Sequence, residues 1–230
     1  AGLQPAQSFP WAPDDTFFRC TTPQTFFQSS EFNKEHFYIQ DPSTLLAPAM
    51  LDLKPDSRVA DVCSAPGGKA TCIAERLGPT GSLICSDRNP ARLSLVKRNL
   101  RQAPNCEFRV ADATTPPAQP ASLDRILLDV PCSNTGVIRR RPDVRWRFSR
   151  KKLRDLVQLQ RELLEGCCGC LAPGGCLVYS TCSIEPEETA EQVRRFMVDH
   201  PVFALEQETC LLPDADHDGA YAARLRIPDG

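Results

Sequence analysis

From Ser57 onwards, short apolar runs alternate with longer stretches whose apolar residues recur at helical spacing. This alternation is typical of strand–helix–strand units, which assemble into a mainly parallel sheet covered by helices. The runs predict strands at Arg58–Cys63, Ser82–Asp87, Cys106–Ala111, Asp124–Val130, Cys176–Ser180, Val202–Glu206 and Tyr221–Ile227. The intervening stretches predict helices at Lys69–Leu77, Pro90–Gln102, Ser149–Cys170 and Glu187–His200. The pattern therefore predicts an α/β protein.

Residues 1–50 lack this periodicity and are rich in Pro, Phe and Gln. We interpret them as a lead-in, and residues 51–230 as one folded domain that is long enough to bury a sizeable core. The aromatic residues of the lead-in are too many for a disordered tail. We expect them to pack against the domain; they are Phe17, Phe18, Phe26, Phe27, Phe32, Phe37 and Tyr38. Since the chain does not begin with methionine, we expect it to be a fragment of a longer protein.

The composition is that of an ordinary soluble globular protein, with 41% hydrophobic and 24% charged residues. No apolar stretch approaches the roughly 20 residues that a membrane-spanning helix needs, and no secretory signal opens the chain. The 12 cysteines occur singly or crowd together at Cys167, Cys168 and Cys170. That spacing matches neither a disulfide framework nor the paired motifs of structural zinc. We therefore expect a reducing, cytoplasmic setting, no bound metal and, by default, a monomer.

A dense basic segment interrupts a chain whose net charge is only -2. Between Arg139 and Arg154 there are nine Arg or Lys residues and a single acid, with Trp146 and Phe148 interleaved. Such a patch is typical of surfaces that bind nucleic acids, although a solvated loop leading into a helix is the alternative. The arginines expected to contact RNA are Arg139, Arg140, Arg141, Arg145 and Arg147.

Two Cys-Ser pairs each follow a predicted strand. Pro131-Cys132-Ser133 comes after the fourth strand, and Thr181-Cys182-Ser183 comes after the fifth. The carboxyl ends of parallel strands share one edge of the sheet, which is where open α/β folds hold their ligands. Two thiols at that edge indicate cysteine chemistry on a substrate. The alternative is that both are small buried core residues, the common fate of free cysteines.

A glycine-bearing turn and three acids lie at the same predicted edge. Residues 61–69 read Asp-Val-Cys-Ser-Ala-Pro-Gly-Gly-Lys and connect the first strand to a helix, so their backbone can approach a ligand closely. Asp87, Asp112 and Asp129 lie at the ends of the next three strands. Asp87 stands where an acid accepts from ribose hydroxyls, and Asp112 would reach an adenine amino group. The sulfonium of S-adenosylmethionine is cationic and is compatible with nearby acids, whereas the pyrophosphate of NAD is anionic and needs amides and bases. The pattern therefore favours S-adenosylmethionine over NAD.

These motifs resemble the RNA (cytosine-5) methyltransferases of the Sun/Fmu (RsmB-like, Nol/Nop/Sun) type. The resemblance runs in order from about residue 38 to residue 227. It rests on residues 40–44, 61–69, 129–136, 140–146 and 180–183, on Glu187-Glu188, and on Asp218-Gly219. It implies a Rossmann-like class I S-adenosylmethionine-dependent methyltransferase: a mostly parallel seven-stranded sheet with an antiparallel last strand and helices on both faces. It also implies that residues 1–50 are a remnant of an RNA-binding domain.

The resemblance implies a role for each matching residue. The methionine end of the cofactor would be lined by Cys63, Ser64, Ala65, Pro66, Gly67, Gly68 and Lys69. Asp87 would bind the ribose, with Arg92 nearby, and Asp112 would lie at the adenine. Asp129 would lie near both the cofactor and the target base. Ser64 and Asn134 depart from the family, which often has Ala and Gly there, but Asn tolerates a left-handed backbone.

Cytosine methylation at carbon 5 explains why cysteine is needed. A thiolate that adds to carbon 6 makes carbon 5 nucleophilic enough to accept a methyl group, and the thiolate then leaves. Asp129 would share a proton with the ring, which requires a raised pKa. The residues alone do not decide which thiol attacks. By resemblance to the RNA family, Cys182 is the nucleophile and Cys132 assists product release, whereas analogy with DNA cytosine methyltransferases would choose Cys132.

Two other classes of function compete with this interpretation. A thiol-disulfide or metal protein could be built on the cysteine-rich helix, although Cys167 and Cys170 lie far from the amino end that lowers thiol pKa values. A non-catalytic RNA-binding scaffold could keep the same fold. Among RNA substrates, the Arg-Arg-Arg-Pro-Asp-Val-Arg-Trp block looks most like the bacterial ribosomal enzymes, so ribosomal RNA is expected and transfer RNA is the alternative.

Overall fold

The computed structural model describes residues 3–5, 9–11, 18–30, 37–115 and 118–229. Its central sheet contains the strands β3 (Arg58–Asp61), β4 (Ser82–Asp87), β5 (Cys106–Val110), β6 (Leu123–Asp129), β7 (Leu171–Thr181), β8 (Ala204–Leu211) and β9 (Ala220–Arg226). Their order is β5-β4-β3-β6-β7-β9-β8. The first five in that order are parallel, and β9 is antiparallel to both of its neighbours. The expected α/β sheet with an antiparallel last strand is confirmed.

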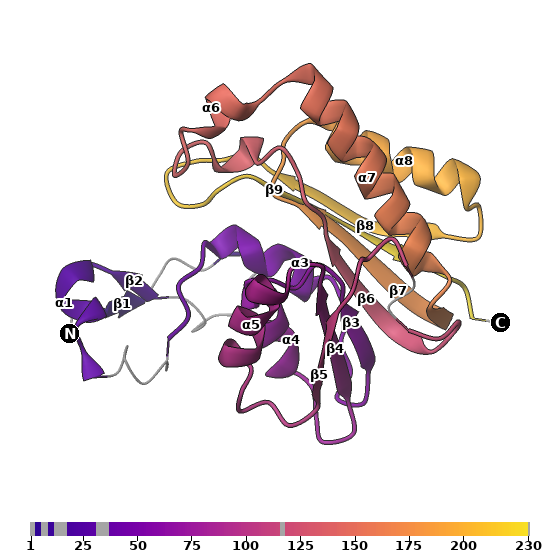
Figure 1. Ribbon diagram of the computed structural model, residues 1–230, viewed down its shortest axis with the longest axis horizontal. Helices are drawn as coiled ribbons and strands as arrows, with labels where there is room; N and C mark the ends of the chain where they lie inside the picture. The colour runs from indigo at the N-terminus through magenta and orange to yellow at the C-terminus, as the bar shows by residue number, and fades with distance from the viewer. Residues whose placement is uncertain (1–2, 6–8, 12–17, 31–36, 116–117, 230) are drawn as a thin grey trace.

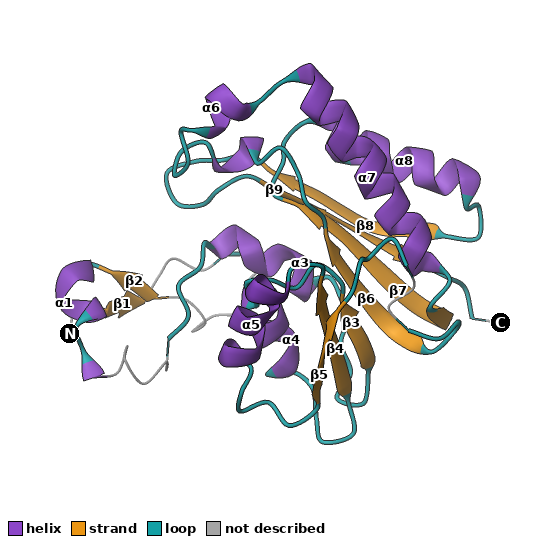
Figure 2. Ribbon diagram, in the orientation of Figure 1, coloured by secondary structure: helices purple, strands orange, loops and turns teal. Residues whose placement is uncertain are grey.

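Helices cover both faces of this sheet (Figures 1 and 2). One face carries η1 (Pro42–Leu45), α3 (Leu46–Ala49), α4 (Gly68–Ala74) and α5 (Pro90–Asn99), and the other carries α7 (Arg150–Cys168) and α8 (Ala190–Asp199). Successive residues of β6 divide between the two cores: Ile126 and Leu128 join the core under α7 and α8, and Leu127 joins the other. A strand buried on both faces is apolar throughout, which is why an unbroken apolar run predicted it.

Three predicted elements differ from the structure. The strand β7 begins at Leu171 rather than Cys176, because Leu171 pairs with Leu123 and the Pro-Gly-Gly sequence lies inside the strand. The strand β8 begins two residues later than predicted, at Ala204, and extends beyond the predicted end at Glu206 to Leu211. Its side chains are mostly exposed, and two of its acids bond polar groups of β9: Glu206 with Arg226 at 2.6 Å and Glu208 with Tyr221 at 2.7 Å. A search for apolar runs therefore finds the start of this strand but not its extension beyond Glu206.

The predicted helix at Glu187–His200 is interrupted. A short turn, η3 (Pro186–Glu188), precedes α8, and the backbone of Thr189 between them has φ -118 and ψ -116. The Tyr179 hydroxyl donates to the carbonyl oxygen of Glu188 at 2.7 Å, and the Glu188 side chain is fully buried. The helix therefore starts late because Glu188 is turned into the protein. The remaining connection, between β6 and α7, holds η2 (Thr135–Val137) and α6 (Val144–Arg147).

The lead-in contacts the domain through residues other than those expected. Its described elements are β1 (Leu3–Pro5), β2 (Phe18–Cys20) and α1 (Pro23–Phe27), which lie to one side of the sheet (Figure 1). Phe9 and Trp11 pack on Leu45, and the Trp11 indole donates to the Pro42 carbonyl at 3.0 Å. Of the expected aromatics, Phe26 is buried against the rings of Phe27 and Phe37. Half or nearly half of Phe18 and Phe27 is exposed, Tyr38 is also exposed, and Phe17 and Phe32 lie outside the described residues.

The expected boundary at residue 50 falls inside the folded core. Leu46, Ala47 and Met50 are buried in the same cluster as Leu127 of β6. Residues 42–50 therefore pack as part of the sheet domain.

Candidate active site

The predicted glycine turn between β3 and α4 is held by backbone bonds to both neighbouring strands. The Ser64 amide donates to the Ser86 carbonyl at 2.9 Å, and the Val62 amide donates to Leu127 at 3.0 Å. Gly67 has φ +108, in the left-handed region that favours glycine. A Cβ on Gly68 would lie only 2.6 Å from the Tyr38 ring, so this glycine lets the lead-in approach the turn. These contacts hold the backbone of the turn in place, and the turn lines a cavity on its other side.

Beneath the turn lies Asp61, whose carboxylate is almost completely buried. One oxygen accepts from the Ser64 hydroxyl at 3.0 Å, and the other has no hydrogen-bond partner among the described residues. Burial raises the pKa of Asp61 to about 7, and the nearby Asp129 carboxylate adds to the shift. Asp61 lines a cavity of about 220 Å³ together with Cys63, Ser64, Ala65, Pro66, Gly68, Lys69, Asp129, Arg140 and residues of the lead-in. An unpartnered acidic oxygen at this cavity suits a cationic ligand such as S-adenosylmethionine.

Asp87 and Arg92 are next to the turn but do not line this cavity. Asp87 is buried at the end of β4, where it accepts from the Asn89 amide at 2.9 Å. Arg92 lies 3.6 Å from the Asp87 carboxylate and donates to the Ala65 carbonyl at 2.7 Å. Arg92 therefore links the ribose candidate to the turn.

Asp112 follows β5 and is exposed, two strands away from the turn. Its carboxylate accepts from the Thr114 amide and hydroxyl, each at 3.0 Å. The Thr114 amide is the main reason why the pKa of Asp112 lies below its ordinary value. The expected role of Asp112 at the adenine stays a prediction.

Lys69 and Asp129 form an ion pair at the edge of the sheet. The Lys69 ammonium lies 2.6 Å from one Asp129 oxygen, and the Ser180 hydroxyl donates to the other at 2.7 Å. Burial alone would lower the pKa of Lys69, but the attraction of Asp129 outweighs it and the pKa is raised. Sequence reasoning missed Ser180, although the register of parallel strands places it directly beside Asp129.

The two candidate thiols are in contact. Their Sγ atoms lie 3.3 Å apart, because β6 and β7 are neighbours and both cysteines follow them directly. The Cys182 thiol also lies 3.2 Å from Oδ1 of Asn134. Asn134 has φ +62, the left-handed conformation expected of it, and Gly136 approaches so closely that a Cβ there would lie 2.5 Å from the Cys182 carbonyl oxygen.

The contact between the two thiols shifts their pKa values in opposite directions. Their mutual hydrogen bond lowers the pKa of Cys132 and raises the pKa of Cys182 well above its ordinary value. The Lys69 ammonium acts in the opposite direction on Cys182 and favours its anion. Either thiol can be the donor of their mutual hydrogen bond, so geometry alone does not assign the nucleophile.

A buried acid, Glu188, holds the loop that carries Cys132 in place. The Glu188 carboxylate accepts from the Ser133 amide at 2.9 Å, from the Ser133 hydroxyl, and from the Gln160 amide at 2.9 Å. Glu188 and Gln160 are fully buried, and the Tyr179 hydroxyl lies 3.2 Å from Gln160. Glu188 was part of the sequence resemblance, but no pattern along the chain indicated that it points inward to hold this loop.

The five arginines expected to contact RNA fall into two groups. Arg139 and Arg140 bridge two buried acids from distant segments: Arg140 donates to Asp218 at 2.6 Å, and Arg139 lies 3.7 Å from Asp41. The pKa of Arg140 is raised by its hydrogen bond to Asp218. The others are Arg141, Arg145 and Arg147, which are exposed; Arg141 and Arg147 lie 3.9 and 3.1 Å from Asp143. All five side chains are exposed, but only the first group also fastens the basic segment to the domain.

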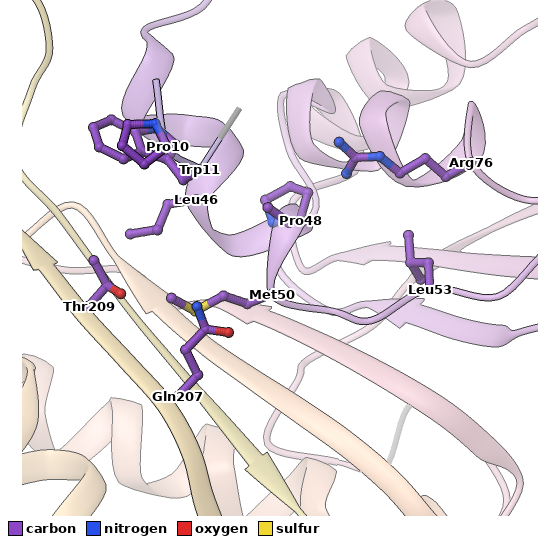
Figure 3. A pocket seen from close by; sticks show the side chains of 10 residues that line it. Pro10, Trp11, Leu46, Pro48, Met50, Leu53, Arg76, Gln207 and Thr209 are labelled. Atoms are coloured by element: carbon purple, nitrogen blue, oxygen red, sulfur yellow. The ribbon is translucent and has the colours of Figure 1, made fainter. Parts of the chain in front are cut away.

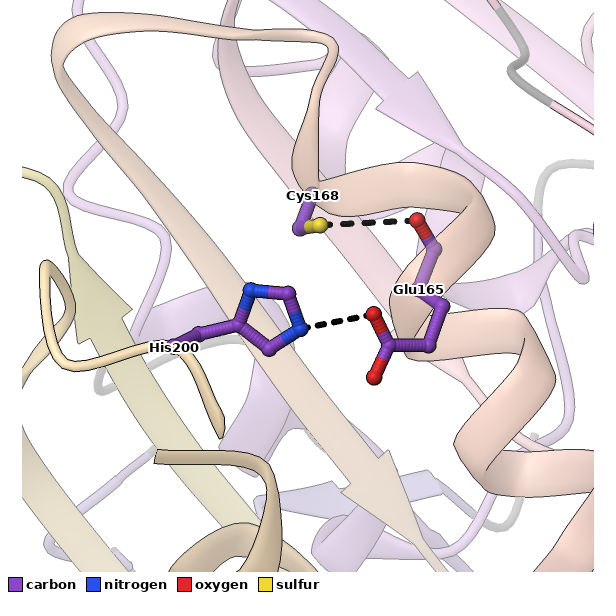
Figure 4. A group of neighbouring side chains, drawn as sticks. All are labelled: Glu165, Cys168 and His200. Atoms are coloured by element: carbon purple, nitrogen blue, oxygen red, sulfur yellow. Dashed lines mark hydrogen bonds and ion pairs between the residues drawn. The ribbon is translucent and has the colours of Figure 1, made fainter. Parts of the chain in front are cut away.

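One group of side chains has the composition of a metal site (Figure 4). Glu165, Cys168 and His200 lie together where α7 and α8 end. Each ligand atom already has a protein partner: His200 bonds Glu165 at 2.6 Å, Arg161 pairs with Glu165 at 2.8 Å, and the Cys168 thiol contacts the Glu165 carbonyl at 3.4 Å. The CxxC thiols of Cys167 and Cys170 bond separate backbone carbonyls. These contacts explain the cluster without an ion.

A cavity of about 600 Å³ lies next to α3 and is lined by residues that include Trp11, Met50, Leu53 and Gln207 (Figure 3). None of the sequence-predicted site residues lines it. In the described part of the chain, no helix is long and apolar enough to cross a membrane.

Known proteins place this geometry in a family. The family model of the 16S rRNA methyltransferase RsmB/F matches residues 48–228. Ribosomal RNA small subunit methyltransferase B of Pectobacterium atrosepticum is 36% identical over 230 residues, which cover 95% of this chain and 53% of that protein. This chain spans about half the length of the curated relatives it matches.

Solved structures agree. A methyltransferase homologue from Pyrococcus horikoshii has a TM-score of 0.81 at 28% identity, over 98% of this chain and 79% of that one. The structure of NSun6 from the same organism with SFG has a TM-score of 0.79 at 28% identity, over 89% and 56% of the two chains. Fold and site together define an S-adenosylmethionine-dependent methyltransferase of class I. Within that class, the chain belongs to the RsmB/F family of 16S rRNA methyltransferases.

Proposed function

We propose that this chain is the catalytic part of an enzyme that methylates carbon 5 of a cytosine in ribosomal RNA. The observation that carries the proposal is the pair of thiols 3.3 Å apart beside the Lys69–Asp129 ion pair. Cytosine methylation needs both features at once: a nucleophile for carbon 6, and groups that hold a proton at the ring while carbon 5 reacts.

S-adenosylmethionine, when bound, supplies the methyl group. All of residues 63–69 except Gly67 line the cavity that would hold its methionine end, and the Asp61 carboxylate beside it would offset its positive charge. Asp87 takes the ribose hydroxyls, with Arg92 holding it against the turn, and Asp112 takes the adenine.

The target cytosine leaves its stack to enter the site. The thiolate of Cys182 adds to carbon 6 while the Lys69–Asp129 pair supports protonation of the ring nitrogen. Carbon 5 then accepts the methyl group and loses its proton. Once Cys182 is bonded to carbon, Cys132 loses its thiol proton to solvent, and its thiolate takes the proton from carbon 5 as the carbon–sulfur bond breaks. The ring nitrogen returns its proton to the Lys69–Asp129 pair, and Cys182 leaves as a thiolate beside the protonated Cys132, which restores the starting pair.

The exposed group Arg141, Arg145 and Arg147 contacts RNA phosphates through an attraction that is largely independent of sequence. Arg139 and Arg140 act indirectly, because their ion pairs with Asp41 and Asp218 hold the basic segment in place on the domain. The protein works as a cytoplasmic monomer, and the part of the lead-in before Pro42 is the remnant of an RNA-binding domain.

Transfer of a labelled methyl group from S-adenosylmethionine into unmodified 16S rRNA, followed by nucleoside analysis, tests the proposal. We expect 5-methylcytosine, and a parallel reaction on transfer RNA decides between the two substrates. Cofactor binding without any methylated cytosine would establish the non-catalytic scaffold instead.

Trapping experiments assign the two thiols. We expect Cys132→Ala to accumulate a denaturation-resistant RNA complex and Cys182→Ala to form none. The exposed Cys210 offers a matched control, because Cys210→Ser should behave like the unmodified protein. Trapping by Cys182→Ala in place of Cys132→Ala would reverse the assignment.

A further inference from the structure

A second cavity adjoins the Cys132 loop. Its volume is about 220 Å³, and its wall contains residues 132–134, the region of α6, and the first turns of α7 (Figure 1 shows both helices). It shares no lining residue with the cofactor cavity, although Cys132 follows Asp129 by only three positions. The proposed function assigns no ligand to it.

The lining is apolar inside and cationic at the rim. Val144 and Leu153 are buried, and Phe148 and Leu156 are half-buried. The rim carries the exposed side chains of Arg141, Arg147 and Lys152, and no carboxylate belongs to the described lining. The corner is internally braced, since the Lys152 ammonium donates to the Arg147 carbonyl at 3.2 Å and the Ser149 hydroxyl caps α7.

This chemistry fits a flat apolar group that carries a negative charge at one end. A nucleotide has that form, because bases of unpaired RNA are recognised by stacking on aromatic and apolar side chains while cations hold the phosphates. The volume is below the roughly 300–1,000 Å³ of pockets for drug-sized ligands, so it suits a single base. We propose that this cavity receives the nucleotide next to the target cytosine in the RNA strand.

The inference rests on the proposed function and extends it to the substrate. A cytosine attacked beside Cys132 leaves its neighbour within reach of a cavity that begins at the same residue. Holding that neighbour out of the stack stabilises the strand in the opened form that the reaction needs. The cavity would also make the enzyme sensitive to the identity of one flanking base.

The test compares two labelled single strands of equal length in a binding assay. One is RNA with a central cytosine, and the other carries abasic residues on both sides of that cytosine. For the unmodified protein we expect the complete RNA to bind about tenfold more tightly, the effect of losing one stacked base. Leu156→Trp fills the cavity and should abolish this preference. Gln158→Trp, exposed on α7 and outside the lining, should keep it.

A second variant guards against misfolding of the first. Arg147→Ala changes only the exposed rim and should reduce the slope of log affinity against log salt by about 0.7, the share of one phosphate on a single strand. Arg154→Ala, exposed on α7 but outside the lining, should change it less. Equal slopes in these two variants, or a Leu156→Trp protein that keeps the base preference, would overturn the proposal.

Methyl transfer measured in the same samples separates the two proposals. A protein that prefers the complete RNA but methylates nothing keeps the cavity assignment and loses the proposed reaction. A protein that methylates cytosine without any preference for flanking bases keeps the reaction and loses the cavity assignment.

Discussion

Asp61 connects the stability of this protein to its cofactor site. Burial raises its pKa to about 7, against about 3.9 for an exposed aspartate. Between about pH 4 and pH 7 the folded protein keeps a proton that the unfolded chain has released. The folded state binds more protons in this window, so the free energy of unfolding decreases as pH rises through it. At 1.36 kcal/mol for each pH unit, the loss is at most about 4 kcal/mol.

Replacing the carboxylate by its neutral analogue removes this loss. We expect Asp61→Asn to match the unmodified protein within about 1 kcal/mol at pH 5, because the roughly 1.5 kcal/mol already lost there through ionisation of the unfolded chain is offset by the cost of burying an incompletely bonded amide. At pH 8 the variant should be more stable by about 1–3 kcal/mol, less than the full loss because the new amide is itself incompletely bonded. Urea unfolding at both pH values measures the difference.

The control is Asp56→Asn, an exposed aspartate just before β3. It should show the same small effect at both pH values. If Asp61→Asn changed stability equally at pH 5 and pH 8, the carboxylate would not be a buried group with a raised pKa, and the reasoning would fail.

The same shift predicts a proton linked to cofactor binding. A cationic ligand favours the ionised form of Asp61, so binding near pH 6 should release a proton. Calorimetry in buffers of different ionisation enthalpy detects this release. Asp61→Asn should bind S-adenosylmethionine more weakly and release less.

Three further predictions concern the thiol site. Lys69→Met removes the partner of Asp129, so the rate of single-turnover methyl transfer should decrease at least ~100-fold. The pH profile of that rate should also move to higher pH, because Lys69 favours the Cys182 anion; an unchanged profile would contradict this. Glu188→Gln places an amide donor against the donors of Ser133 and Gln160, which should lower stability by about 1–3 kcal/mol in urea unfolding. Glu187→Gln is the control: its side chain is half-buried and pairs only with the exposed Arg150, so the change should have little effect. Hydrogen peroxide should oxidise one of the two thiols to a sulfenic acid with release of water, and the second thiol should displace another water to form a Cys132–Cys182 disulfide. Peptide mass spectrometry should find this linkage, and dithiothreitol should restore activity.

Local patterns along the chain determined the order of the elements and the position of the site. Apolar runs located the parallel strands because those strands are buried on both faces, as Leu127 and Leu128 show. Chain order then placed the turn after β3 and the cysteines after β6 and β7 at one edge, since parallel strands all end there. The full length of edge strand β8 and the interrupted start of α8 escaped this reasoning. The polar pairs that continue β8 beyond Glu206 and the inward-turned Glu188 leave no periodic pattern in the sequence.

The tertiary structure alone decided which charged and nucleophilic groups meet. The contact of Cys132 with Cys182 joins segments 50 positions apart, and Lys69 reaches Asp129 across 60. A dense run of arginines predicted an RNA surface, but only the fold shows that two of them, Arg139 and Arg140, pair with the buried Asp41 and Asp218. Residue type and local spacing specify what a side chain can do. Its partner, and therefore its pKa and its role, depends on burial and long-range packing that only the fold creates.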